Sequence, residues 1–111
     1  MRKTSNIHAR QFVKDHEEFQ GNNLHGDIVV RDGTAMYCVW SYGYWPLFVY
    51  VAPVEKWYEN TDRYSVTTSK HRSQTHPHCD TVRVNRAALT DLINRGADAL
   101  PEIAAMLKVS P

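Results

Sequence analysis

Apolar residues near the start of the chain recur at the spacing of an amphipathic helix, and this pattern predicts a surface helix over residues 6–19. Asn6 is a residue type favoured at an N-cap, and Gly21 with the two asparagines after it is typical of a helix end. The apolar positions that define the packing face are Ala9, Phe12, Val13 and Phe19. We therefore expect this helix to pack one face on the rest of the domain.

The next apolar runs are short and rich in β-branched and aromatic residues, which is typical of strands. Ile28–Val30 predicts a first strand, and residues 34–42 predict a second. Asp32-Gly33 lies between them and predicts a two-residue type I′ hairpin turn, because both positions tolerate a positive φ. Residues 47–51 predict a third strand, and residues 56–59 predict a short fourth one.

The last third of the chain combines one brief strand with two helices. Residues 81–84 predict the strand, Asn85 is the expected N-cap of a helix that ends at Gly96, and Pro101 fits the first turn of the last helix. The apolar positions of the two helices are Leu89, Leu92, Ile93, Ile103, Met106 and Leu107. Because the earlier strands follow one another without intervening helices, the sequence predicts a single α+β domain over residues 1–111. Its expected architecture is a small antiparallel β-meander of three or four strands, packed with an N-terminal helix and two C-terminal helices.

Composition narrows the class of protein. The formal net charge is +1, so no global field attracts nucleic acid or an anionic membrane, and any basic site must be local. Cys38 and Cys79 are too few for a disulfide framework, which favours a reducing compartment. The sequence contains no apolar run of membrane-spanning length and no signal-peptide pattern. We therefore expect a soluble intracellular protein with no membrane partner.

Aromatic residues are concentrated in one part of the chain. Nine of the twelve, including all three tryptophans, lie between Tyr37 and Tyr58. One interpretation is that these rings fill the core of a small domain, since each buries on the order of 150–250 Å². The other interpretation is that Tyr42, Tyr44 and Trp45, in a loop around Gly43, form an exposed platform for a partner or for stacked bases.

Residues 61–79 are dominated by hydroxyl, basic and imidazole side chains, so we expect them to contribute little to a core. The basic and aromatic members are Arg63, Tyr64, Lys70, His71 and Arg72. Such a set suits phosphate, because cations supply charge while hydroxyls and backbone N–H groups supply directed hydrogen bonds. If residues 69–74 are helical, Lys70 and Gln74 share a face, as do Ser69 and Ser73. The alternative interpretation is a solvated loop whose hydroxyls cap its own turns.

Histidine and cysteine side chains in the same segment raise the question of a metal site. The residues concerned are His71, His76, His78 and Cys79. Their spacing matches no closed zinc-binding pattern, so we expect no metal and no cofactor. Cys79 or Ser69 beside a histidine has the residue types of a nucleophile, but nothing resembles a nucleophile elbow. The sequence therefore predicts no catalytic residue.

Three stretches carry a resemblance to a known family. They are Phe19–Leu24 (FQGNNL), Ser41–Tyr50 (SYGYWPLFVY) and Trp57–Gln74 (WYENTDRYSVTTSKHRSQ). Together they resemble a domain-of-unknown-function family of bacteriophages, prophages and plasmids, in which an SYG...P...VY strand pair leads to a W-x-x-N-x-D-[RK]-Y-S-x-T-T-S-[RK]-H-x-S-Q segment. The match covers about residues 12–79, and the turn at residues 52–55 replaces a shorter acidic turn. The resemblance implies an origin in a mobile element and a bacterial cytoplasmic setting, and it implies no mechanism.

These observations favour a small non-enzymatic phage or mobile-element accessory protein that binds a host macromolecule. The first partner class is a host protein or protein complex, for example one of defence or of nucleic-acid processing. One alternative is a nucleic-acid-binding module, in which the 61–79 segment contacts phosphate and Tyr64 or Trp45 stacks on a base. A second alternative is a small metal-dependent enzyme that uses the His/Cys cluster. The candidate binding residues are Tyr42, Tyr44, Trp45, Arg63, Tyr64, Ser69, Lys70, His71, Arg72 and Gln74.

Overall fold

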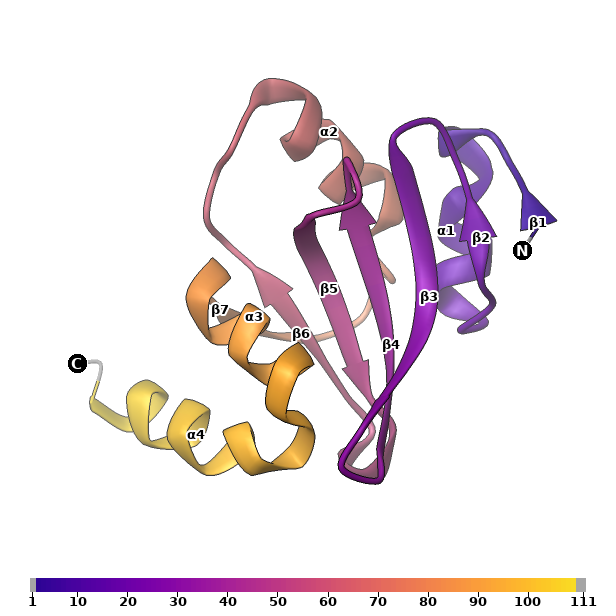
Figure 1. The fold of residues 1–111 in the computed structure, drawn as a ribbon. Helices are drawn as coiled ribbons and strands as arrows, with labels where there is room; N and C mark the ends of the chain where they lie inside the picture. The colour runs from indigo at the N-terminus through magenta and orange to yellow at the C-terminus, as the bar shows by residue number, and fades with distance from the viewer. Residues whose placement is uncertain (1, 110–111) are drawn as a thin grey trace.

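The computed structural model describes residues 2–109, which form a seven-stranded sheet with helices on both faces (Figure 1). The strands are β1 (Arg2–Lys3), β2 (Phe19–Gln20), β3 (Leu24–Arg31), β4 (Thr34–Ser41), β5 (Trp45–Val51), β6 (Lys56–Asn60) and β7 (Thr81–Val84). The helical elements are η1 (Asn6–His8), α1 (Ala9–Lys14), η2 (Ala52–Val54), α2 (Val66–Thr75), α3 (Arg86–Arg95), η3 (Gly96–Ala99) and α4 (Leu100–Val109). Over residues 2–109, no helix is long and apolar enough to cross a membrane.

The strands lie in chain order across the sheet, antiparallel from β2 to β6 and parallel at both ends. The predicted antiparallel meander of three or four strands is therefore wrong in strand number and in strand direction, although the domain is α+β. One reason is that β1 and β2 have two residues each, which is too short to leave an alternating pattern in the sequence. The other is that α2 crosses back over the sheet, and such a crossover is what allows β7 to pair parallel to β6.

The N-terminal helix is shorter than the predicted residues 6–19. η1 and α1 end at Lys14, and His16 has a φ of 55°, which takes the chain out of the helical conformation. Phe19 then lies buried in β2 rather than on the helix. Phe19 and Val13 belong to the same buried cluster but reach it from different elements. This shared burial explains why the helical pattern of apolar residues extended beyond the real end of the helix.

Three local predictions are confirmed by the structure. Asp32 and Gly33 both have positive φ values, 48° and 77°, between β3 and β4. The Asn85 side chain accepts a hydrogen bond from the Ala88 N–H at 2.8 Å and so caps α3. Gly96 ends α3 with a φ of 64°, at a point where a β-carbon would lie 2.7 Å from the Arg31 carbonyl oxygen.

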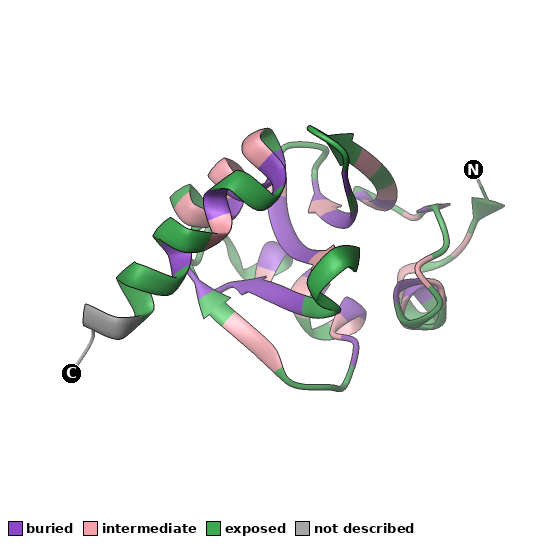
Figure 2. Cartoon of the chain, turned by 90° about the horizontal axis from the view of Figure 1, so that it is seen from below, coloured by how far each residue is buried: buried purple, intermediate pink, exposed green. Residues whose placement is uncertain are grey.

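Each face of the sheet has its own apolar cluster. On one face α3, η3 and α4 pack over Met36, Cys38, Val49, Val51, Tyr58 and Val84. On the other face α1 packs over Phe19, Leu24, Tyr37, Val39, Leu47, Phe48 and Trp57, and α2 lies beside α1. Figure 2 shows the buried strands between the two layers of helices. The polar segment of the sequence therefore provides a covering helix rather than a loop.

Candidate binding surface

The carboxyl ends of the parallel strands β6 and β7 bring together the segments that build the candidate site. Asn60 and Val84 are partners in the ladder, so the residues that follow each strand emerge at the same edge. The Arg86 N–H donates to the Asp62 carboxylate at 2.9 Å and joins the two segments. The Asn60 side-chain amide donates to the Pro46 carbonyl at 2.8 Å, which fixes the β4–β5 turn at this edge.

α2 begins beside this edge and is held to the sheet by polar side chains. Ser65 caps the helix, because its hydroxyl accepts from the Thr68 N–H at 3.1 Å. Thr68, His71 and Thr75 are buried, and their i, i+3, i+7 spacing places them on one face. The expectation that residues 61–79 contribute little to the interior is therefore wrong for these three positions, since the helical period is present in polar rather than apolar residues.

A buried hydrogen-bonded group joins α2 to β4. The Ser41 hydroxyl lies 2.8 Å from His71 Nδ1 and 3.3 Å from the Thr68 hydroxyl. Burial, together with the nearby charge of Lys70, lowers the pKa of His71 below its ordinary value, which favours the neutral ring. Ser41 is fully buried, so this serine–histidine pair has no access to a substrate and acts as a structural contact.

A second polar group anchors the middle of α2 through the buried carboxylate of Glu59. The Thr81 hydroxyl donates to Glu59 Oε1 at 2.6 Å, Arg72 Nε lies 3.6 Å from Oε2, and His76 Nε2 lies 3.5 Å from Oε1. Arg72 also donates to the Asn60 carbonyl at 3.1 Å. Buried charges need such partners, and Arg72 is therefore engaged with the sheet rather than presented to a partner molecule.

Aromatic side chains from the β4–β5 turn and from residues 61–65 form one exposed cluster. The Tyr44 hydroxyl donates to the Tyr64 hydroxyl at 2.6 Å, and this hydrogen bond raises the pKa of Tyr44. The Trp45 and Tyr64 rings have centroids 4.8 Å apart, and the Arg86 guanidinium lies 5.5 Å from the Trp45 ring centroid. Tyr44 and Tyr64 remain 56% and 53% exposed, so the cluster is preformed yet open.

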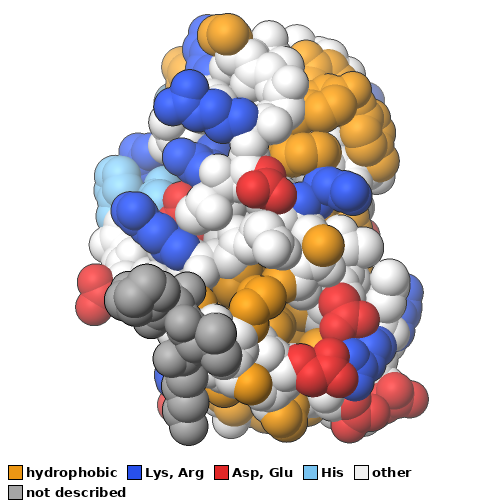
Figure 3. Space-filling view, turned by 90° about the vertical axis from the view of Figure 1, so that its left-hand side faces the viewer, with side chains coloured by type: hydrophobic (Ala, Val, Ile, Leu, Met, Phe, Trp, Pro, Cys, Tyr) orange, Lys and Arg blue, Asp and Glu red, His pale blue; other side chains and the backbone are white. Residues whose placement is uncertain are grey.

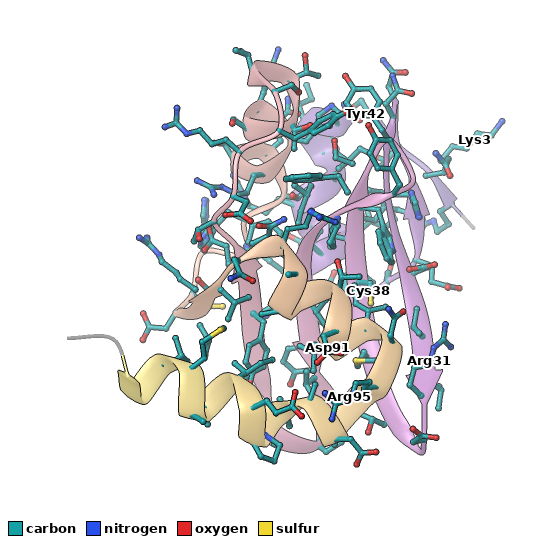
Figure 4. All side chains as sticks on the ribbon, turned by 60° about the vertical axis from the view of Figure 1, so that its left-hand side comes forward. Lys3, Arg31, Cys38, Tyr42, Asp91 and Arg95 are labelled. Carbon is teal, nitrogen blue, oxygen red and sulfur yellow. The ribbon has the colours of Figure 1, made fainter. Side chains whose placement is uncertain are left out.

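Tyr42 occupies an unusual backbone position in the turn. Its φ is 56°, next to Gly43 at 79°, so a bulky residue sits where asparagine or glycine is favoured. Its ring is exposed, and the ring centroid lies 5.7 Å from that of His71. Figure 4 labels Tyr42 near the top of the view. Residues held in such conformations concentrate at functional sites. Tyr42 thus adds a residue in a sparsely populated conformation to the edge that carries Tyr44 and Trp45.

We define the aromatic–basic surface as the half-buried Trp45 together with seven exposed side chains of this edge and of the start of α2: Tyr42, Tyr44, Arg63, Tyr64, Val66, Lys70 and Arg86. Val66 is 89% exposed, which is unusual for an apolar residue in a helix. In Figure 3 apolar, Lys and Arg side chains gather on the upper half of the face that it shows, while Asp and Glu gather mainly at its lower right. The surface thus combines apolar rings with positive charge.

The remaining candidate residues of α2 are divided between exposed and half-buried positions. Lys70 is exposed, Ser69 is half-buried, and Gln74 is half-buried with its Oε1 atom enclosed and without a hydrogen-bond partner among the described residues. Lys70 and Gln74 therefore do not form one exposed binding face of the helix. Of the ten residues proposed from the sequence, the structure brings Tyr44, Trp45 and Tyr64 into direct contact and sets His71 and Arg72 into structural contacts with the sheet.

The residues considered for metal binding or nucleophilic catalysis lie in different environments. His71 is buried against β4, whereas His76 accepts from the His78 N–H through its Nδ1 at 3.0 Å. Within residues 2–109, no three His, Cys, Asp or Glu side chains are grouped so that they could hold a metal ion. Partial burial, and then the Asp80 charge, raise the pKa of Cys79, which disfavours a reactive thiolate.

Two members of the surface were missed by reasoning from sequence. Arg86 follows the N-cap of α3, and its place beside Trp45 depends on the parallel pairing of β6 with β7. No local pattern could have predicted that contact. Val66 could have been found, because a β-branched apolar residue directly after a Ser N-cap starts a helix with its side chain outside the polar packing face.

The chain matches no family model, and neither the curated proteins nor the solved structures contain a match to it. The resemblance to a family of mobile elements therefore stays a prediction.

Proposed function

We propose that this chain is a non-enzymatic accessory protein of a phage or other mobile element, which binds a host protein through the aromatic–basic surface. The observation that carries the proposal is the preformed cluster at the sheet edge, in which the exposed rings of Tyr44 and Tyr64 contact each other and Tyr64 packs on the half-buried Trp45. Contiguous exposed apolar side chains on a small domain mark interaction sites. Tyrosine, tryptophan and arginine are also the residues that contribute most to binding at protein interfaces.

Preorganisation supports a role in tight binding. The rings are already held by one another, by Arg86 and by the turn, so ordering them on contact with a partner removes little conformational freedom. The groups with catalytic chemistry are less suited to a site. Ser41 and His71 are buried, and the Cys79 thiol has a raised pKa. The accessible chemistry of this edge is therefore that of recognition.

Affinity capture from bacterial lysate tests the proposal. Tagged wild-type protein, a Tyr44→Ala/Tyr64→Ala variant and a Lys56→Ala control are compared, each with and without nuclease. Lys56 is exposed at the opposite end of β6, so the control keeps the aromatic–basic surface intact. We expect a stoichiometric, nuclease-resistant host protein with the wild type and the control, and its loss with the double variant. Equal capture by all three proteins would contradict the proposal.

The charge of the same surface favours single-stranded nucleic acid as the second candidate partner. Arg86 lies beside the Trp45 ring, Arg63 and Lys70 are exposed in the same surface, and the Asp62 carboxylate accepts from the Arg86 N–H. Aromatic platforms flanked by basic residues bind single strands by stacking and by contact with phosphate. Fluorescence anisotropy with a labelled oligonucleotide decides between the two partners. Binding that weakens steeply with salt would favour nucleic acid, because each neutralised phosphate releases counterions.

A further inference from the structure

The outer edge of β3 is open over its last five residues, Asp27–Arg31. β2 pairs only with His25 and Gly26, whereas β4 pairs with β3 along its whole length. In the part of the chain that the structure describes, no strand lies beyond Asp27–Arg31. Figure 1 shows this stretch of β3 continuing below β2 and α1 toward the hairpin at the bottom of the view. The sheet therefore has an unpaired edge far from the aromatic–basic surface.

Backbone groups at this edge are held by flexible charged side chains. The Ile28 N–H donates to the Glu18 carboxylate at 3.0 Å, which shows that Ile28 points its backbone groups toward the open side. Strand alternation directs the N–H and carbonyl of Val30 the same way. The Val30 carbonyl accepts from the Arg31 guanidinium at 3.1 Å. Glu18 and Arg31 are both exposed, so a pairing strand could displace them.

The side chains beside this edge are apolar and exposed. Ile28 and Val30 lie on the face that α1 covers only in part, and they are 55% and 57% exposed. A shallow hollow of about 140 Å³ lies next to them, with Ile28, Tyr37 and Tyr50 among its lining residues. Open strand edges with exposed apolar residues pair readily with another strand. A strand added here would also cover part of this face.

We propose that a second copy of this chain docks at the edge, with the two β3 strands antiparallel about a two-fold axis at Val29. In this register Ile28 faces Val30 of the second copy, and Asp27 faces Arg31 of the second copy. By symmetry each pair occurs twice, with apolar residues opposed on one face and opposite charges on the other. The segment Asp27-Ile28-Val29-Val30-Arg31 is therefore complementary to itself in charge and in hydropathy.

Other registers of the same edge lose these contacts. With the two-fold axis at Ile28, Val30 would face Gly26 of the second copy, whose edge is already occupied by β2. With the axis at Val30, Ile28 would face Asp32 of the second copy, which belongs to the hairpin turn. The axis at Val29 keeps every pair within the open stretch. The resulting dimer has one continuous sheet and carries two aromatic–basic surfaces at its far ends.

Sedimentation velocity over a range of protein concentrations tests the dimer and its register. We expect wild-type protein to associate reversibly into dimers. Arg31→Asp and Asp27→Arg each place like charges in both symmetric pairs. Each variant alone should therefore self-associate with a dissociation constant raised roughly tenfold or more. An equimolar mixture of the two variants should recover association as a heterodimer, because acid again faces base.

Folding of the variants is checked by circular dichroism, because Asp27 accepts a hydrogen bond from the Trp40 indole at 2.9 Å. Lys56→Asp is the matched control, a charge reversal away from the edge that should leave association unchanged. A second readout is amide hydrogen exchange at Val30, which should slow as the protein concentration rises. Wild type that stays monomeric at all concentrations, or a mixture that fails to associate, would overturn the proposal. Slow exchange at Val30 only after another protein is added would instead identify that protein as the occupant.

Discussion

α2 and α3 are both ten-residue helices that cover the sheet, yet they are held to it by different forces. α3 buries Leu89, Leu92 and Ile93, whereas α2 buries Thr68, His71 and Thr75. Apolar burial is strong but non-directional, while hydrogen bonds require a narrow range of distance and angle. α3 therefore contributes mainly to the stability of the fold, whereas α2 fixes the position of the side chains beside it. The helix that borders the aromatic–basic surface is the one held by directional contacts.

The largest expected effect comes from the apolar helix. Leu92 is fully buried in the cluster under α3, so Leu92→Ala should lower the free energy of unfolding by about 2–5 kcal/mol. The folded fraction should still capture the partner, because α3 contributes only Arg86 to the surface. Urea unfolding followed by circular dichroism measures the loss. A change below about 1 kcal/mol would contradict the assigned role of α3.

A smaller stability effect with a larger functional effect is expected from Ser41→Ala. The substitution leaves His71 Nδ1 without its buried partner, which should lower the free energy of unfolding by about 1–3 kcal/mol. Because α2 loses its directional contact with β4, partner capture by the folded protein should also fall. Ser73→Ala, at an exposed position of the same helix, is the matched control. Unchanged capture by Ser41→Ala would show that the Ser41–His71 contact is not needed for binding by the aromatic–basic surface.

Removal of the N-cap side chain from each helix tests whether α2 and α3 are held to the sheet in different ways. Ser65→Ala and Asn85→Ala each remove a side chain that accepts from a backbone N–H, and each should lower the free energy of unfolding by about 0.5–2 kcal/mol. The two substitutions should differ in where amide exchange becomes faster. α2 has no apolar anchor and should show faster amide exchange locally, while α3 should stay protected up to global unfolding. Hydrogen-exchange mass spectrometry distinguishes these patterns, and equal local exchange in both helices would contradict the comparison.

The smallest expected effect is a pH dependence that comes from α2. Burial lowers the pKa of His71 in the folded state, so the unfolded chain takes up the proton first as the pH falls below about 6.5. The contribution of His71 to the free energy of unfolding is therefore complete above that pH. It decreases as the pH falls from there to the lowered pKa. His71→Asn should reduce the decrease. Thermal unfolding of the wild type and of His71→Asn between pH 7 and pH 5 measures this difference. An identical pH dependence of the two proteins would exclude His71 as a source of the stability loss.

Local chemistry decided which parts of the fold were predictable from sequence. The cap at Asn85, the turn at Asp32-Gly33 and the apolar period of α3 follow from neighbouring residues, and they are where expected. The two-residue strands β1 and β2 are too short to leave a pattern. The parallel pairing of β7 depends on a crossover by a helix whose buried face is polar, and apolar periodicity does not detect such a helix.

The candidate site was predictable only in part for the same reason. One of the two interpretations placed Tyr42, Tyr44 and Trp45 in an exposed loop, and the structure has Tyr44 and Trp45 in contact with Tyr64 of the 61–79 segment. Arg72 was expected to face a partner, but the buried carboxylate of Glu59 draws it toward the sheet. Arg86 joins the surface through pairing between segments that are distant in the sequence. Residue type predicted the chemistry, and tertiary pairing decided which side chains are free to use it.

Site-specific photocrosslinking in living bacteria tests directly whether the aromatic–basic surface binds a host protein. A benzophenone amino acid in place of Tyr64 samples the aromatic–basic surface, and the same group in place of Lys56 samples the opposite end of the sheet. We expect irradiation to join the Tyr64 position to one host protein, identified by mass spectrometry, and to give no such adduct at the Lys56 position. Adducts only with nucleic acid, or the same protein adduct at both positions, would contradict the claim that this surface binds a host protein.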